Sequence, residues 1–319
     1  MKARYLLLVI ISALFLLAGC KKKGDPVPSI ETIPPQFIGS KTVTLGCRAT
    51  SDVKQTFINC GVYIDNVPNP EVSGSKFTFG SDTGLFMAQV YGFTPNTLYY
   101  VKAYALNTTA EVQGETFSFT TPAFVTDNDG VEMETVIIKD QRWMAKNLRS
   151  RFFRNGETIP TLSGDLTSVD SPVSTWFAKG IADTAISYGN LYTWYAVTDA
   201  RNICPTGWHV PTDAEWTTLE NNLGGNLVAA SSLKEHGNRH WLAPYNIDAT
   251  NMSCFTALPA GYRSVSGDFA LLQSEGHFWT SDQSETTKAW ERSLSASSYS
   301  VTRVATDKKS GYSVRCIKD

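Results

Sequence analysis

The sequence predicts a multi-domain protein in which an all-β sandwich is followed by an α+β domain. Residues 36–122 consist of short alternating apolar segments separated by turn residues, which is the pattern of half-buried strands. Residues 123–319 combine a capped amphipathic helix with short β segments towards the end of the chain. With 319 residues, of which 42% are hydrophobic, the chain can form two packed cores.

The first 19 residues have the features of a bacterial signal peptide. Lys2 and Arg4 supply positive charge, and the apolar run at 5–17 is too short to span a bilayer as a helix. The sequence Leu-Ala-Gly-Cys at 17–20 resembles the lipobox of bacterial lipoproteins. This resemblance implies cleavage before Cys20 and attachment of lipid to its thiol, which anchors firmly because each buried methylene contributes about 0.8 kcal/mol. An ordinary signal peptide with a chance cysteine is the alternative.

Residues 20–35 predict an exposed tether, because three lysines follow Cys20 and four prolines come after them. We therefore expect a cell-envelope protein whose first partner is the membrane, held through the lipid on Cys20, with the outer membrane as the expected location. Some lipoproteins carry an acidic cluster after the cysteine as a surface-export signal. Here that position is basic, so a periplasmic and an extracellular orientation both remain open.

Charge and cysteine content narrow the classes of function. Without residues 1–19, which contain Lys2 and Arg4, 26 basic residues (28 minus 2) stand against 30 acidic ones, a net charge of −4. Such a chain lacks the basic face that a nucleic-acid partner needs. Apart from Cys20, five of the six cysteines remain, so at least one is unpaired. Proximity in the sequence predicts a disulfide between Cys47 and Cys60.

The all-β domain contains one stretch that resembles a known consensus. Candidate strands lie at 42–47, 60–64, 76–79, 85–91 and 115–121, and the clearest β stretch is 93–105. The stretch Phe-Thr-Pro-Asn-Thr-Leu-Tyr-Tyr-Val at 93–101 resembles fibronectin type III domains, which implies that Tyr99 is the tyrosine-corner residue and that the domain is a spacer. Asp82-Thr83-Gly84 is interpreted as a hairpin turn and not as an aspartic protease site, because a second copy is missing.

Several motifs of the second domain follow one another in a recognisable order. They are VIIKDQRWMAKNL at 136–148, YGNLYTWYA at 188–196, CPTGWHVPTDAEW at 204–216, FTALPAGYR at 255–263, FWTS at 278–281 and GYSVRC at 311–316. In this order they resemble the Fibrobacter succinogenes major paralogous domain of bacterial surface lipoproteins. The resemblance implies a C-type-lectin-like fold related to the formylglycine-generating enzymes. Lectin-like domains are closed by a disulfide from just before a helix to the final strand, and Cys204 and Cys316 stand in that relation, which leaves Cys254 free.

Local patterns agree with an α+β fold. Thr212-Asp213-Ala214-Glu215 is a capping box that begins a helix, and Gly224 is a suitable stop. Two further helices are predicted at 190–199 and 227–236, and late strands at 289–294, 298–304 and 313–317.

None of the candidate chemical sites is complete. The related oxidases use a cysteine pair upstream of the last strand, and 290–311 contains no cysteine. Calcium-dependent lectins need several converging oxygen ligands, and the segment 279–282 (WTSD) resembles their Trp-Asn-Asp motif only weakly. Trp279 is therefore predicted to be a core residue and not part of a calcium site. His236 and His240 have the spacing of helical zinc ligands, but Gly237 interrupts the helix. We therefore predict no catalytic residue, no metal and no cofactor.

The segment 240–246 (HWLAPYN) is the predicted ligand surface, with His240, Trp241 and Tyr245 as its candidate residues. Exposed aromatic side chains stack on sugars, and no helical or strand period in this segment demands burial. Packing against the long loop is the alternative. Cys254 stands where the family usually has glycine and is predicted to be a buried small residue. His209 is predicted to be a hydrogen-bonded core residue.

These observations favour a non-catalytic envelope lipoprotein whose lectin-like domain binds a glycan or a surface protein. A purely structural envelope component is the second hypothesis. An enzyme related to the formylglycine-generating oxidases is the third, and the chain lacks a coherent set of acid, base, nucleophile and metal ligands for it.

Overall fold

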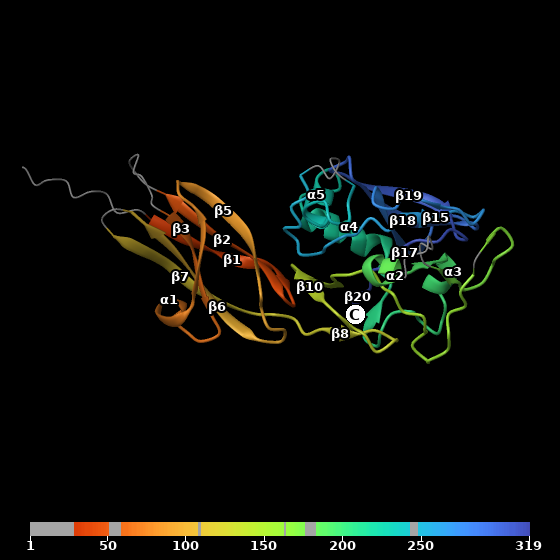
Figure 1. The fold of residues 1–319 in the computed structure, drawn as a ribbon, viewed down its shortest axis with the longest axis horizontal. Coiled ribbons are helices and arrows are strands. Elements are labelled where there is room, and N and C mark those ends of the chain that lie inside the picture. Colours follow the sequence, from red (N-terminus) through yellow and green to blue (C-terminus); the bar gives the residue numbers. More distant parts are fainter. Residues whose placement is uncertain (1–28, 51–58, 108–109, 163, 176–182, 243–247) are drawn as a thin grey trace, which may run out of the picture.

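The computed structural model describes residues 29–50, 59–107, 110–162, 164–175, 183–242 and 248–319. The predicted signal peptide, Cys20 and most of the predicted tether lie outside these ranges. Within them, no helix is both long and apolar enough to cross a membrane. Figure 1 shows two bodies placed end to end, a β-sandwich and a mixed C-terminal domain.

The N-terminal domain is a sandwich of two antiparallel sheets, as the alternating pattern predicted. One sheet has the order β1–β2–β5 and the other β4–β3–β6–β7. The elements are β1 (Ser29–Gly39), β2 (Thr42–Thr50), β3 (Asn59–Asp65), α1 (Pro70–Ser73), β4 (Ser75–Gly80), β5 (Gly84–Tyr91), β6 (Leu98–Leu106) and β7 (Glu111–Thr120). Inward-facing residues of both sheets, among them Val43, Leu45, Val62 and Val101, form one core.

Strand β1 begins earlier than the sequence predicted. The predicted tether extended to residue 35, but residues from Ser29 to Ile33 already pair with β2. Pro34 and Pro35, which lack a backbone donor, fall where the register shifts, between Ile33 and Phe37. Strand β1 therefore begins seven residues before the boundary predicted at residue 36, because the prolines interrupt the strand without ending it.

Two local predictions in this domain have different outcomes. Tyr99 forms the predicted tyrosine corner, since its hydroxyl accepts the backbone N–H of Thr94 at 3.0 Å. A turn is present at Asp82, but it is not a hairpin turn. It joins β4 to β5, which belong to different sheets.

In its described residues, the C-terminal domain is built from short strands, one three-stranded sheet and four helices. The strands are β8 (Val125–Thr126), β9 (Glu132–Met133), β10 (Thr135–Ile138), β11 (Gln141–Met144), β12 (Ser174–Thr175), β13 (Leu191–Tyr192), β14 (Trp208–His209), β15 (Tyr262–Arg263), β16 (Phe269–Ala270), β17 (Glu275–Gln283), β18 (Lys288–Ser295), β19 (Val301–Asp307) and β20 (Ile317–Lys318). The helices are α2 (Asp183–Tyr188), α3 (Trp194–Val197), α4 (Asp213–Asn222) and α5 (Ala229–Leu233).

Helix α4 confirms the capping-box prediction. The side chain of Thr212 accepts the N–H of Glu215, the Glu215 carboxylate accepts the N–H of Thr212, and Gly224 follows the helix with φ of +96°. The other two predicted helices are shorter than expected: α3 covers part of 190–199 and α5 part of 227–236. Helix α2 was not predicted.

The beginning and the end of the C-terminal domain meet in one sheet. Trp143 of β11 pairs with Ile317 of β20, and β20 pairs in turn with β14. The predicted disulfide between Cys204 and Cys316 is present. It ties the segment before α4 to the last strand, so the domain is closed by pairing and by a covalent bond.

The two domains share a sheet. Strand β1 of the sandwich pairs with β10 through Phe37, Ile38 and Gly39, so seven strands run without a break from β5 to β14. Side chains add to this junction: the Thr44 hydroxyl donates to the carbonyl of Met252 at 2.6 Å, and the N–H of Thr135 donates to the Ser40 hydroxyl at 3.0 Å. Backbone pairing and buried hydrogen bonds together join the domains into one unit (Figure 1).

Candidate functional site

The structure does not support the predicted ligand surface at 240–246. Trp241 is only 1% exposed, and its indole N–H donates to the carbonyl of Ala257 at 3.1 Å, so it belongs to the core. His240 is half-buried, with Nδ1 2.8 Å from a carboxylate oxygen of Glu235. Tyr245 lies outside the described residues. The prediction for Trp241 was wrong because the residues that cover it come from distant parts of the chain.

The cysteines are arranged differently from the prediction in one respect. Cys47 and Cys60 are free thiols buried in the core of the sandwich, so the predicted disulfide between them is not formed. Burial, followed by the neighbouring Cys60 thiol, raises the pKa of Cys47 to about 12. Disulfide exchange requires a thiolate, and the raised pKa keeps the Cys47 thiol protonated, so exchange at this residue is suppressed. Cys254 is also free and 4% exposed, as predicted.

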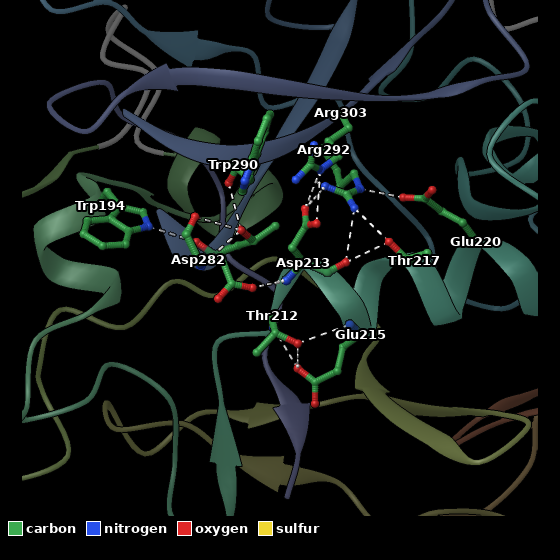
Figure 2. Close-up of polar contacts among 11 residues, drawn as sticks. Trp194, Thr212, Asp213, Glu215, Thr217, Glu220, Asp282, Trp290, Arg292 and Arg303 are labelled. Carbon is green, nitrogen blue, oxygen red and sulfur yellow. Dashed lines mark hydrogen bonds and ion pairs between the residues drawn. The ribbon is translucent and has the colours of Figure 1, made fainter. Parts of the chain in front are cut away.

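The side chains of Trp279 and Asp282, in the segment 279–282, have structural roles. Trp279 is fully buried and its indole N–H donates to the carbonyl of Tyr192 at 2.7 Å, which confirms the core prediction. The carboxylate of Asp282 accepts the N–H of Asp213, the first residue of α4, at 2.7 Å (Figure 2). Asp282 thus binds a helix N-terminus, where a negative charge is favourable.

Four charged side chains join α4 to the three-stranded sheet (Figure 2). The buried guanidinium of Arg292 donates to Asp213 and to Glu220, both at 2.6 Å. Arg303 donates to Asp213 at 2.9 Å and lies 3.2 Å above the centre of the Trp290 ring. Burial raises the pKa of Asp213, but the hydrogen bonds from Arg303 and Arg292 outweigh it and hold that pKa below its ordinary value. The network fixes the helix on the sheet. Burial raises the pKa of Glu220 above its ordinary value, although the hydrogen bond from Arg292 opposes this.

A second ionic group lies on the sheet formed by β17, β18 and β19. His277 contacts Glu275 through Nε2 at 3.1 Å and Glu291 through Nδ1 at 3.4 Å, and the Tyr312 ring stacks on it at 5.1 Å. Burial lowers the pKa of His277, but the hydrogen bonds to the two glutamates raise it more, to about 9. The imidazole therefore stays protonated at neutral pH and acts as the counter-ion of the buried Glu291 and the half-buried Glu275.

His209 is not a core residue, contrary to the prediction. Its ring is half-exposed and contacts Glu215 at 2.9 Å and Asp319 at 2.7 Å. Burial lowers the pKa of His209, while the hydrogen bonds to the two acids raise it above its ordinary value. Glu215 has two structural partners, the backbone of Thr212 and this histidine. Among the described residues, no group of three or more His, Cys, Asp or Glu side chains is arranged to hold a metal.

A cavity of about 480 Å³ lies at the junction of the two domains. The sandwich contributes the turn between β1 and β2, with Lys41, and the end of β5, with Tyr91. The C-terminal domain contributes Glu134, Glu235 and His236, together with the loop 251–256. Its volume lies in the range of about 300–1,000 Å³ that small-molecule sites occupy.

The wall of this cavity is held in an unusual backbone conformation. Asn251, Cys254 and Thr256 have φ values of +52°, +57° and +55°. Such values cost of the order of 1–3 kcal/mol for residues other than glycine, and a β-branched residue such as threonine adopts them rarely. Two hydrogen bonds hold the loop, from Asn251 Nδ2 to Thr256 Oγ1 and from the Thr256 N–H to Asn251 Oδ1. Glycine adopts the positive φ seen at Cys254 without this steric cost.

Sequence reasoning missed this cavity. Lys41 and Tyr91 lie in the first domain, about 100–200 positions before Glu235 and His236, and none of them belongs to a recognisable motif. The departure from the usual glycine at Cys254 was interpreted as a buried small residue and not as part of a cavity.

Comparisons with known proteins give one match that covers much of the chain. The model of the Fibrobacter succinogenes major domain matches residues 136–318. None of the curated proteins matches. Two solved structures are similar to part of the chain, each with a TM-score of 0.25. One is the sensor domain of the anti-sigma factor RsgI4 of Pseudobacteroides cellulosolvens, 17% identical, covering 30% of this chain and 95% of that one. The other is the sixth fibronectin type III domain of human fibronectin type III domain containing protein 3, 18% identical, covering 32% of this chain and 92% of that one.

The matched segment contains every motif that the sequence analysis singled out in the second domain, from the strands β10 and β11 to the final Cys316. It also contains the capping box of α4 and both cysteines of the disulfide. Because the family model covers more than half of its residues, this chain belongs to the Fibrobacter succinogenes major domain family.

Proposed function

We propose that this protein is a lipid-anchored component of the bacterial cell envelope. In this proposal the fibronectin type III-like domain is a spacer, and the C-terminal domain is a lectin-like, non-catalytic binding domain. Its ligand is a glycan or another surface protein.

One observation carries the proposal: the start of β1 and the C-terminal domain lie at opposite ends of the sandwich. Strand β1 starts at Ser29 and reaches β10 only at Phe37–Gly39. An 11-residue strand spans about 35 Å. A lipid on Cys20, nine residues before Ser29, would therefore hold the far end of the sandwich and direct the C-terminal domain away from the membrane (Figure 1).

The rigid junction supports a display role. Two domains on a flexible linker would reorient freely, whereas the pairing of β1 with β10 fixes their relative position. A binding domain held at a constant height and orientation meets ligands on a neighbouring surface at a lower entropic cost than a freely moving one.

The lectin-like interpretation is supported by how the domain closes. The early strands β10 and β11 lie in one sheet with the last strand, β20. The disulfide from Cys204, before α4, to Cys316, before β20, has the placement expected from the resemblance. The ionic groups at Arg292 and His277 have structural partners, which supports binding over catalysis.

Fractionation of the producing cells tests the anchoring. The wild-type protein is expected in the membrane fraction, labelled by a radioactive fatty acid, and Cys20→Ser is expected to remove the label. Ser29→Cys added to the Cys20→Ser protein is the matched control, because it places a thiol outside the lipobox. It should not restore the fatty-acid label. Labelling of the Cys20→Ser protein would contradict the proposal.

A glycan array probed with the detergent-solubilised protein tests the binding role, with calcium and again with a chelator. Saturable binding would support the lectin-like interpretation, and loss with chelator would reveal a metal requirement. Absence of binding by a folded sample would leave a protein partner or a purely structural envelope role.

A further inference from the structure

We propose that the cavity at the domain junction binds a neutral sugar ring, so that the fibronectin type III-like domain is part of the binding site and not only a spacer. The inference deepens the proposed function and rests on it, since it names the site and the ligand class of the same binding activity.

Both domains must be docked for the cavity to exist. The turn at 39–42 and the residues Tyr91 and Gly92 form one wall, and the loop 251–256 forms the other. These walls are connected directly, because the amide of Gln89 donates to the carbonyl of Asn251 at 2.5 Å and Thr44 donates to Met252. The position of the walls is thus fixed before a ligand arrives, which lowers the cost of binding.

The charges around the cavity are balanced. Glu134 lies 3.4 Å from the ammonium of Lys146, and Glu235 lies 2.8 Å from Nδ1 of His240. Lys41 adds a positive charge at the rim, where its ammonium lies 5.1 Å from the centre of the Phe124 ring. An anion would meet two carboxylates and a cation would meet Lys41 and Lys146, so neither is favoured over a neutral ligand.

The lining offers both hydrogen-bond donors and acceptors, which suits a ligand rich in hydroxyl groups. Carboxylates carry about four lone-pair sites each, so Glu134 and Glu235 can accept further hydrogen bonds from hydroxyl groups. Nδ1 of His236 lies 2.8 Å from the carbonyl of Ala249 and must donate to it, which makes Nε2 the acceptor of a neutral ring. Lys41 supplies donors. A sugar hydroxyl both donates and accepts and can satisfy either kind of group.

Tyr91 supplies the apolar surface that a sugar ring requires. Its side chain is 64% exposed at the rim of the cavity, and its hydroxyl donates to Gln89 at 2.8 Å, which holds the ring in place. The face of an aromatic ring is electron-rich and attracts the C–H groups of a pyranose. Tyr91 also precedes the residues that the family model matches, so a dependence of binding on Tyr91 would be specific to the junction.

The test uses the full-length protein in detergent on an array of neutral, anionic and amino-sugar oligosaccharides, followed by calorimetry with the best neutral oligosaccharide. Tyr91→Ala is expected to weaken binding at least roughly tenfold, the usual scale for an aromatic anchor. Tyr299→Ala, which removes an exposed tyrosine elsewhere on the C-terminal domain, is the matched control and should leave affinity unchanged. Tryptophan fluorescence and circular dichroism verify that each variant is folded.

Each outcome decides. Neutral-glycan binding lost with Tyr91→Ala and kept with Tyr299→Ala supports the inference. Binding that Tyr91→Ala leaves intact overturns the junction site but leaves the proposed function standing. Tyr91-dependent binding restricted to anionic or amino sugars overturns the ligand class. If the folded wild-type protein binds no glycan, the inference fails together with the glycan part of the proposed function.

Discussion

The ionic group around His277 predicts a pH-dependent stability that His277→Gln should remove. The two glutamates raise the pKa of His277 from 6.5 to about 9 in the folded protein. Because the folded pKa lies above the unfolded one, the stabilisation is fully present below pH 6.5 and is lost as the pH rises through about 9. A shift of about 2.5 pKa units corresponds to about 3 kcal/mol at 1.36 kcal/mol per unit. Glutamine keeps the hydrogen-bonding capacity of a neutral imidazole but cannot carry the charge.

Urea unfolding followed by tryptophan fluorescence measures this effect cleanly. All eight tryptophans lie after residue 142, so the signal reports the C-terminal domain alone. We expect the wild-type protein to be about 3 kcal/mol more stable than His277→Gln at pH 6 and the difference to shrink to a small value by pH 10. His236→Gln is the control, because that ring is exposed and contacts a carbonyl and not a carboxylate.

A difference between wild type and His277→Gln that stays constant from pH 6 to pH 10 would refute this reasoning. It would mean that His277 contributes by packing against Tyr312 and not by its charge.

Three further predictions concern stability and thiol chemistry. Thr212→Ala removes the acceptor of the capping box and should lower the unfolding free energy, measured by urea titration, by about 1 kcal/mol. Thr218→Ala, on the exposed face of α4, is the control and should change the unfolding free energy little. Equal effects of the two substitutions would argue against the cap. Cys204→Ser removes a disulfide with a sequence separation of 112 and should lower the unfolding free energy by up to about 5 kcal/mol on the chain-entropy model. The prediction would be contradicted if neither this substitution nor reduction of the wild-type protein changed the melting temperature. In the Cys20→Ser protein, a thiol reagent should find three thiols (Cys47, Cys60 and Cys254) after denaturation and none rapidly before it; a count of one would show that the first two are bonded.

Features governed by neighbouring residues were predictable. The capping box needs only Thr212 and Glu215, three positions apart, and α4 begins where they predict. Tyr99 forms its corner with Thr94, five positions away. The disulfide between Cys204 and Cys316 is distant in sequence, but the ordered motifs between these cysteines implied the fold that brings them together.

Features governed by distant segments were not predictable. Nothing near Trp241 shows that Ala257 accepts its indole N–H and that the ring is therefore buried. Cys47 and Cys60 are close in sequence and lie on strands of opposite sheets, but both are free thiols, which their spacing alone did not reveal.

The sequence was sufficient to establish the order of the domains, the family of the second one, the cap of α4 and the closing disulfide, because each depends on local patterns or on a recognisable order of motifs. Only the tertiary structure shows that β1 extends the sheet of the C-terminal domain and that a cavity forms between Tyr91 and the loop 251–256. The physical reason is that strand pairing and burial depend on which surfaces meet after folding. The residues next to Lys41 and Glu235 in the sequence do not indicate that these two side chains line the same cavity.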